Sequence, residues 1–167
     1  MAGFEPIVGE DPEILILGSM PSLVSLAKIE YYAHPRNSFW WIMGRVFDFN
    51  HQSKYVSRCQ RLIENKVVVW DVLFDCERSG SLDSAIVKNS EIVNDFVLFF
   101  DQYKLVKKVI FNGAAAERIF TRYNKPLMDE LSAQEFPVEW YRCPSTSPAH
   151  ASMTKLAKLI EWSRVLT

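Results

Sequence analysis

Four short apolar segments, each followed at once by turn-forming or polar residues, constrain the fold of this chain more than any other feature. They span residues 13–18 (EILILG), 66–71 (KVVVWD), 107–112 (KKVIFN) and 137–143 (PVEWYRC). Short apolar runs rich in β-branched residues and bounded by turn signals are typical of buried strands, and runs without polar alternation favour a parallel sheet covered on both faces. The sequence therefore predicts four strands of one buried sheet.

Amphipathic patterns between these segments predict the helices. The predicted helices cover residues 38–47, 55–64, 91–103, 113–123 and 152–166. Strands that alternate with helices indicate an α/β fold, here a three-layer α/β/α sandwich with a central, mainly parallel four-stranded sheet. Because no linker, internal repeat or low-complexity tract divides residues 1–167, we expect a single domain.

Composition excludes several other classes of protein. The three cysteines are widely spaced and form no C-x-x-C pair, so we expect no metal site and no cofactor, and their sparse use fits a reducing cytosol. The chain begins without a basic signal-peptide region, and no apolar run approaches the roughly 18 residues of a membrane span. We expect a soluble, intracellular, cytoplasmic monomer that does not enter a membrane. The net charge of −1 leaves any nucleic-acid contact to a local patch.

Polar turns follow the predicted strands at positions that should meet in space. In open α/β sheets the carboxyl ends of the strands form one edge, where ligands bind. The residues at these ends are Ser19-Met20-Pro21-Ser22 after Gly18, Asp71, Asn112-Gly113, and Ser145-Thr146-Ser147-Pro148-Ala149. We expect them to line one cleft.

Residues 31–40 (YYAHPRNSFW) can fold over that cleft, since they follow the first of these turns. Pro35 disfavours a helical conformation at His34, and Asn37 or Ser38 can cap the helix that begins next. The segment is therefore predicted to be a constrained loop that leads into a helix.

The aromatic residues of this loop have two explanations. Core packing is the ordinary one for Phe39 and Trp40, whereas Tyr31 or Tyr32 could stack on a flat, neutral ring. Asp71 or backbone amides could then hydrogen-bond the edge of such a ring. A Ser–His–Asp triad is disfavoured because no G-x-S-x-G turn occurs, and a metal site is disfavoured because the three histidines lie far apart.

Taken together, these motifs resemble the uracil-DNA glycosylase superfamily. The shared features are the strand-end turn Gly18-Ser-Met-Pro-Ser22, the run Tyr32-Ala-His-Pro-Arg-Asn-Ser-Phe-Trp40, Gly80-Ser-Leu-Asp83, and the turn Ser145-Thr-Ser-Pro-Ala149. In order and spacing they are most similar to the hypoxanthine-DNA (deoxyinosine) glycosylase family. The resemblance implies an enzyme of DNA base excision repair, with double-stranded DNA containing a deaminated base, hypoxanthine foremost, as its partner.

The resemblance also implies roles for individual residues. Most of the superfamily has Asp, Asn or Glu in the first motif, where this chain has Met20, so the catalytic role passes to Asn37. The base-binding residues it implies are Ser19, Met20, Tyr32 and Asp71. The residues it implies for a wedge that enters DNA are Ser145, Ser147, Pro148 and Ala149.

An amide cannot act as a general base, so the implied mechanism is a largely dissociative one. Asn37 would orient water and stabilise an oxocarbenium-like sugar, while Asp71, if ionised, would accept the ring N–H of the base. Two alternatives stay open from the sequence: a non-catalytic damaged-DNA-binding domain on the same fold, and a nucleoside or nucleotide hydrolase.

Overall fold

A four-stranded parallel sheet forms the centre of the protein, as the sequence predicts. The computed structural model describes residues 2–167. Its strands are β1 (Ile14–Gly18), β2 (Val67–Asp71), β5 (Lys108–Asn112) and β6 (Glu139–Cys143), in the spatial order β2-β1-β5-β6. In the register of the sheet Gly18 lies beside Asp71, and Asn112 lies beside Cys143. The ends of all four strands therefore share one edge.

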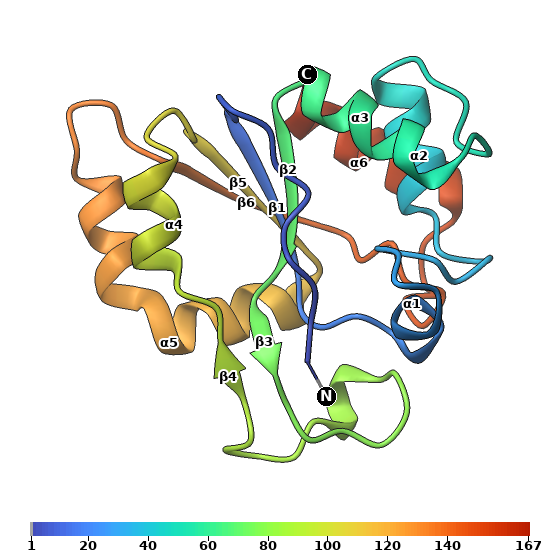
Figure 1. Ribbon diagram of the computed structural model, residues 1–167, viewed down its shortest axis with the longest axis horizontal. Coiled ribbons are helices and arrows are strands. Elements are labelled where there is room, and N and C mark those ends of the chain that lie inside the picture. The colour runs from blue at the N-terminus through green and yellow to red at the C-terminus, as the bar shows by residue number, and fades with distance from the viewer. Residues whose placement is uncertain (1) are drawn as a thin grey trace.

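Helices cover both faces of this sheet, which confirms the three-layer sandwich (Figure 1). On one face lie α4 (Phe96–Gln102) and α5 (Ala114–Ser132). On the other lie α2 (Phe39–Val46), α3 (Tyr55–Glu64) and α6 (Lys155–Leu166). Successive residues of a strand point to opposite faces, so Leu15 and Leu17 pack with α4 and α5 while Ile16 packs with α2 and α6.

Four short elements lie beyond those that the sequence predicts. They are the helix α1 (Leu23–Lys28), the 3₁₀ helix η1 (Asp83–Ala85), and the antiparallel pair β3 (Leu73–Asp75) and β4 (Ile92–Val93). Helix α1 begins at Ser22, whose hydroxyl accepts a hydrogen bond from the Ser25 N–H at 3.1 Å. Of these elements, α1 and η1 contribute residues to the cavity at the carboxyl edge of the sheet.

Three predicted helix boundaries are wrong. Residues 91–95 are not helical, because Ile92 pairs with β3 and Asp95 caps α4 by accepting from the Leu98 N–H. Helix α5 does not stop at 123: the chain kinks at Asn124, whose backbone is non-helical, and continues with Pro126 in the second half. Helix α6 begins at Lys155 rather than 152, because Thr154 caps it. None of the helices within residues 2–167 is both long and apolar enough to span a membrane.

Candidate active site

The turns that follow the strands, together with the aromatic loop, enclose one small cavity of about 100 Å³. Its lining residues are Gly18, Ser19, Met20, Pro21, Ser22, Ser25, Tyr31, Tyr32, Asn37, Asp71, Ser81, Asp83, Asn112, Ser145, Thr146 and Ser147. The expectation of a shared cleft at the carboxyl edge is therefore confirmed. Pockets for drug-sized ligands are typically about 300–1,000 Å³, so this cavity suits a much smaller planar group, of the size of a nucleobase.

Hydrogen bonds hold the aromatic loop rigidly beside the cavity. The indole N–H of Trp40 donates to the Tyr31 carbonyl at 2.8 Å, and the hydroxyl of Tyr31 donates to the carbonyls of Phe4 and Glu5. Phe39 and Trp40 are buried in the core, as the sequence predicts. The loop is thus anchored on both sides of its cavity-lining residues.

Tyr32 lies in the cavity wall in a strained conformation. Its φ of +55° falls in the left-handed region, which costs a non-glycine residue of order 1 kcal/mol. One face of its ring stacks on Phe39, with the ring centroids 4.1 Å apart. Its hydroxyl is buried without a hydrogen-bond partner, and burial raises the pKa of this phenol well above its usual range.

Asn37 lines the cavity and also shapes the start of α2. Its Oδ1 accepts a hydrogen bond from the Phe39 N–H at 3.0 Å, so it supports the helix N-terminus from one residue before the cap position. Ser38 occupies the cap position, but its hydroxyl donates instead to the Thr146 carbonyl. The side chain of Asn37 is therefore fixed by the first turn of the helix.

Asp71 ends β2 and lies opposite Gly18 in the wall of the cavity. Its residue surface is only 3% exposed, and its Oδ2 is buried without a hydrogen-bond partner. The pKa of this carboxyl is raised to about 7, chiefly by burial and also by the Asp83 carboxylate, while Arg78 opposes the shift. A buried acid that titrates near neutral pH is a frequent feature of functional sites.

A carboxylate from a distant part of the chain lies beside the first turn, residues 19–22. Met20 is only 7% exposed and packs with the core as well as lining the cavity. Beside it, the Ser19 hydroxyl donates to Oδ1 of Asp83 at 2.6 Å. Asp83 therefore brings an acid to this turn from 64 residues away.

A buried arginine fastens the segment around η1 to the first turn. The Arg78 side chain is fully buried; its guanidinium donates to the Pro21 carbonyl at 2.5 Å and lies 4.0 Å from Oδ1 of Asp83. The Ser81 hydroxyl accepts from the Leu23 N–H at 2.9 Å. Two distant segments thus form one wall of the cavity.

Thr146 fixes the second turn against the end of β5. Its N–H donates to Oδ1 of Asn112 and its hydroxyl accepts from Nδ2 of Asn112, both at 2.9 Å. Its carbonyl accepts from the Ser38 N–H at 3.0 Å. Thr146, a residue that is 1% exposed, therefore joins three segments of the cavity wall through its backbone and its hydroxyl.

The remaining residues of the second turn lie toward the rim of the site. Ser145 and Ser147 line the cavity, whereas Pro148 and Ala149 are not among its lining residues, and Ala149 is exposed. Lys158 of α6 is buried, and its Nζ donates to the Ser147 carbonyl at 3.2 Å. The turn is a rigid projection beside the cavity.

Comparison with known proteins connects this site with a family, although no family model matches the chain. The chain is 41% identical over 112 residues to the hypoxanthine DNA glycosylase of Methanosarcina barkeri. The matched region covers 66% of this chain and 70% of that protein. It is 37% identical over 115 residues to the hypoxanthine DNA glycosylase of Methanosarcina acetivorans, with 68% and 72% covered. The chain belongs to the hypoxanthine DNA glycosylase family.

The fold agrees with this assignment. A solution NMR structure of a Methanosarcina acetivorans protein, named as a uracil DNA glycosylase, superposes with a TM-score of 0.80 and 31% identity. The match covers 99% of this chain and 95% of that one. The hypoxanthine DNA glycosylase family thus sits within the uracil-DNA glycosylase superfamily, as the motifs imply.

Three polar residues that line the cavity, Asp83, Asn112 and Thr146, make contacts that the sequence does not predict. The local signal for Asp83 is its place in the Gly80-Ser-Leu-Asp83 motif. That motif does not indicate which group the carboxylate contacts. The sequence places Asn112 in a turn at the sheet edge. It does not predict that the Asn112 side chain holds Thr146. Thr146 has no signal of its own, since only the folded chain shows which residue of the turn points inward.

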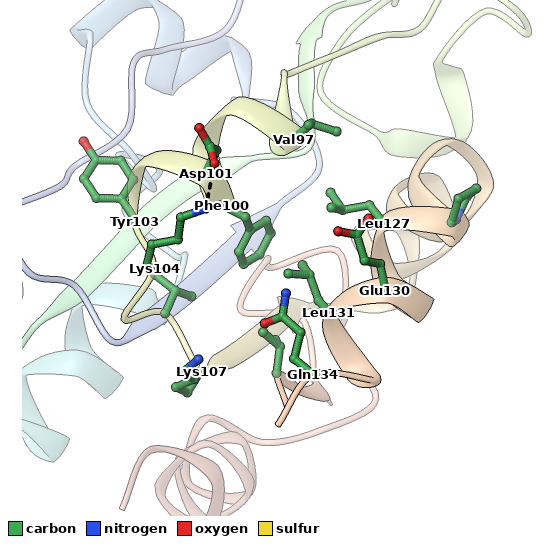
Figure 2. Close-up of a pocket in the computed structure, with 13 residues that line it drawn as sticks. Val97, Phe100, Asp101, Tyr103, Lys104, Lys107, Leu127, Glu130, Leu131 and Gln134 are labelled. Atoms are coloured by element: carbon green, nitrogen blue, oxygen red, sulfur yellow. Dashed lines mark hydrogen bonds and ion pairs between the residues drawn. The ribbon is translucent and has the colours of Figure 1, made fainter. Parts of the chain in front are cut away.

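A larger cavity of about 350 Å³ lies at the opposite edge of the sheet (Figure 2). It is formed between α4 and α5, near the residues that precede β5 and β6, and Leu131 is among its apolar lining residues. Its charged residues are partly paired, as in the 2.6 Å ion pair between Asp101 and Lys104. It contains none of the motif residues of the glycosylase family.

Residues 2–167 contain no group of three or more His, Cys, Asp or Glu side chains arranged to hold a metal ion.

Proposed function

We propose that this protein is a monofunctional DNA glycosylase that hydrolyses the N-glycosidic bond of hypoxanthine in duplex DNA and leaves an abasic site. The observation that carries the proposal is the small cavity at the carboxyl edge of the sheet. Its wall contains Asn37 and Tyr32 from the aromatic loop and Asp71 from the end of β2. The 41% identical relative is itself named a hypoxanthine DNA glycosylase.

A base can reach a cavity lined by the strand-end turns only if it leaves the DNA stack. Enzymes that act on a base in a duplex rotate the nucleotide into a pocket, at a cost of a few kcal/mol. Pro148 and Ala149 project beside the cavity mouth on a turn held by Lys158. In the proposal this turn enters the space that the flipped base vacates, and the serines of the turn contact the DNA backbone.

Asn37 is the proposed catalytic residue. One lone pair of its Oδ1 accepts the Phe39 N–H, and a carbonyl oxygen has a second lone pair available. That lone pair can hold a water molecule and stabilise positive charge at the sugar. Because an amide takes up no proton at neutral pH, the bond to the base breaks first, and the water then adds to the sugar and loses its proton to solvent.

Tyr32 and Ser19 are the proposed contacts of the base. The ring of Tyr32 that stacks on Phe39 has a second face available to a flipped base. The hydroxyl of Ser19 donates to Asp83, so its oxygen retains lone pairs for a donor on the substrate. Met20 supplies apolar lining.

A cleavage assay tests the function. Labelled duplexes with one inosine, uracil or xanthine are incubated with the protein in the presence of a chelator, and abasic sites are then cleaved with alkali. We expect strand breaks at inosine. Tight binding to the inosine duplex without breaks at any of the three bases would instead identify a damage-binding protein, and turnover of free inosine in preference to DNA would identify a nucleoside hydrolase.

A further inference from the structure

The carboxyl of Asp71 is the most unusual group in the cavity because of its burial. It is nearly inaccessible, it forms part of the cavity wall, and its Oδ2 lacks a hydrogen-bond partner. Burial of an unpartnered polar atom costs free energy unless something satisfies it. The natural partner is a molecule that enters the cavity.

The charges around Asp71 favour its neutral form. Asp83, from η1, is a second acid in the same cavity and raises the pKa of Asp71. Arg78 acts in the opposite direction, but its guanidinium is committed to the Pro21 carbonyl and lies near Asp83. Tyr31 and Tyr32, which also line the cavity, remain uncharged at neutral pH because their pKa values are strongly raised. Near neutral pH the acid therefore keeps its proton for much of the time.

We propose that Asp71 recognises the flipped base as a neutral carboxylic acid. One of its oxygens donates an O–H to a ring carbonyl, and the other accepts the N–H of the adjacent ring nitrogen. The substrate class is then defined by a lactam edge, which hypoxanthine, xanthine and uracil all have. This inference rests on the proposed glycosylase function and assigns the protonation state at its base-binding site.

The neutral form matches the hydrogen-bonding edge of the base. It also suits the negative charge that the base gains as the glycosidic bond breaks. An ionised carboxylate could accept the ring N–H but would hold its second oxygen against the carbonyl oxygen of the base. As the glycosidic bond breaks, the departing base gains negative charge, which an adjacent anion would oppose. A carboxylic acid O–H donates to that carbonyl, and this hydrogen bond strengthens as the charge grows. Carboxylic acids kept neutral by an apolar site act in this way in other enzymes.

The variant Asp71→Asn separates the two protonation states. Its amide has nearly the same shape and keeps one donor and one acceptor, but it does not titrate. Single-turnover cleavage of an inosine duplex would be measured from pH 6 to 8.5 for both proteins, a range in which the lactam N–H of inosine stays largely protonated. We expect the wild-type rate to fall by about tenfold per pH unit at high pH. The variant should stay within about tenfold of the wild type at pH 6.5 and show no such fall.

Further variants check the source of the pH dependence. Asp83→Asn removes the neighbouring charge and should move the alkaline fall to lower pH. Asp101→Asn, on α4 and paired with Lys104 outside the site, should leave it unchanged. A variant at Asp71 that loses more than a hundredfold at every pH, while its circular dichroism and melting curve show a folded protein, would overturn the proposal in favour of an ionised carboxylate.

A binding measurement keeps this inference separate from the proposed function. The carboxyl carbon of Asp71 can be titrated by NMR in the free protein, and free hypoxanthine can be titrated into the wild type and Asp71→Asn. We expect the Asp71 carboxyl to titrate above pH 6, and hypoxanthine binding to weaken at high pH only in the wild type. A carboxyl that titrates below pH 5, or binding that is equally pH-independent in both proteins, would overturn the inference even if inosine is cleaved. Failure to cleave any duplex would overturn the proposed function alone.

Discussion

A β-carbon added to Gly18 would lie 2.4 Å from Oδ1 of Asp71, closer than unbonded atoms can approach. The same carbon would lie 2.8 Å from the hydroxyl oxygen of Tyr32. Glycine at the end of β1 thus allows an acid and a phenol, both with a buried unpartnered oxygen, to converge on one point. Close approach of this kind is a common reason for glycine at a ligand site.

Gly18→Ala should therefore damage the cavity more than the fold. The methyl group must displace Asp71 or Tyr32, so we expect cleavage of an inosine duplex to fall by at least about a hundredfold. Affinity for a duplex that already contains an abasic site should change little, because that ligand places no base in the cavity. Equal loss of both would show that the substitution perturbs the whole DNA-binding face.

Asn37→Ala should abolish most of the activity at a small cost in stability. Loss of a polarising group at the reacting centre typically lowers the rate about 10²–10³-fold, while loss of a helix-start hydrogen bond costs about 1 kcal/mol. Single-turnover cleavage and urea unfolding measure the two effects.

Asn50→Ala is the matched control. Asn50 is exposed, and its Oδ1 accepts from the Gln52 N–H at 2.9 Å, the same two-residue pattern outside the cavity. It should lose stability as Asn37→Ala does and keep full activity. Retained activity in Asn37→Ala would remove this residue from the catalytic role.

Asp71 should make the free energy of unfolding fall as the pH rises, which is the opposite of the usual effect of a carboxyl group. Its pKa is raised from 3.8 to about 7, so the folded state holds a proton that the unfolded state releases as the pH rises between these values. The contribution of Asp71 is fully present below pH 4 and is lost as the pH rises through 7. The difference corresponds to about 4 kcal/mol.

Asp71→Asn cannot ionise and escapes this loss. Its free energy of unfolding relative to the wild type should increase from pH 4 to pH 8, as urea unfolding at each pH would show. The exposed Asp101→Asn should show no such increase. A difference for Asp71→Asn that stays constant with pH would mean that the carboxyl is already ionised at pH 4.

Arg78→Met should lower the free energy of unfolding because it leaves the Pro21 carbonyl without its donor. The Pro21 carbonyl loses the guanidinium donor inside the protein, and a buried group without a partner costs about 1–3 kcal/mol, more when the lost partner is charged. Urea unfolding measures the loss. Arg164→Met, which breaks only an exposed pair with Glu161, should change stability by less than about 0.5 kcal/mol.

Pro148→Gly should affect flipping rather than bond cleavage. A flexible turn enters the duplex at a larger cost in conformational entropy, so cleavage of inosine paired with cytosine should fall several-fold. Cleavage of inosine in single-stranded DNA should be nearly unchanged, because no vacated space has to be filled. A parallel fall on both substrates would assign Pro148 to the shape of the cavity instead.

The sequence predicts the layers well because buried strands have a strong local signal. The apolar runs that end at Gly18, Asp71 and Asn112 identify strands and also the edge where they meet. Helix boundaries are predicted less well, since they depend on partners: residues 91–95 have the pattern of a helix, but Ile92 pairs with β3 and Asp95 caps the next turn. Tertiary pairing overrides a local preference there.

The site is predictable only in part for a related reason. Asn37, Tyr32 and Asp71 lie in motifs or at strand ends, and all three line the cavity. The contact between Asp83 and Ser19 joins residues 64 positions apart through a loop anchored by Arg78, and no periodicity encodes it. The protonation of Asp71 likewise depends on burial, which exists only once the chain has folded.

The hydrogen bonds of Thr146 to Asn112 and Ser38 join the turn of residues 145–149, the sheet edge and the start of α2 into one unit. If this turn enters DNA as proposed, it enters with a fixed shape, and the deformation needed for recognition falls on the nucleic acid. That deformation costs least where a base pair is already weakened. Such a protein would select damaged sites by how easily their DNA deforms.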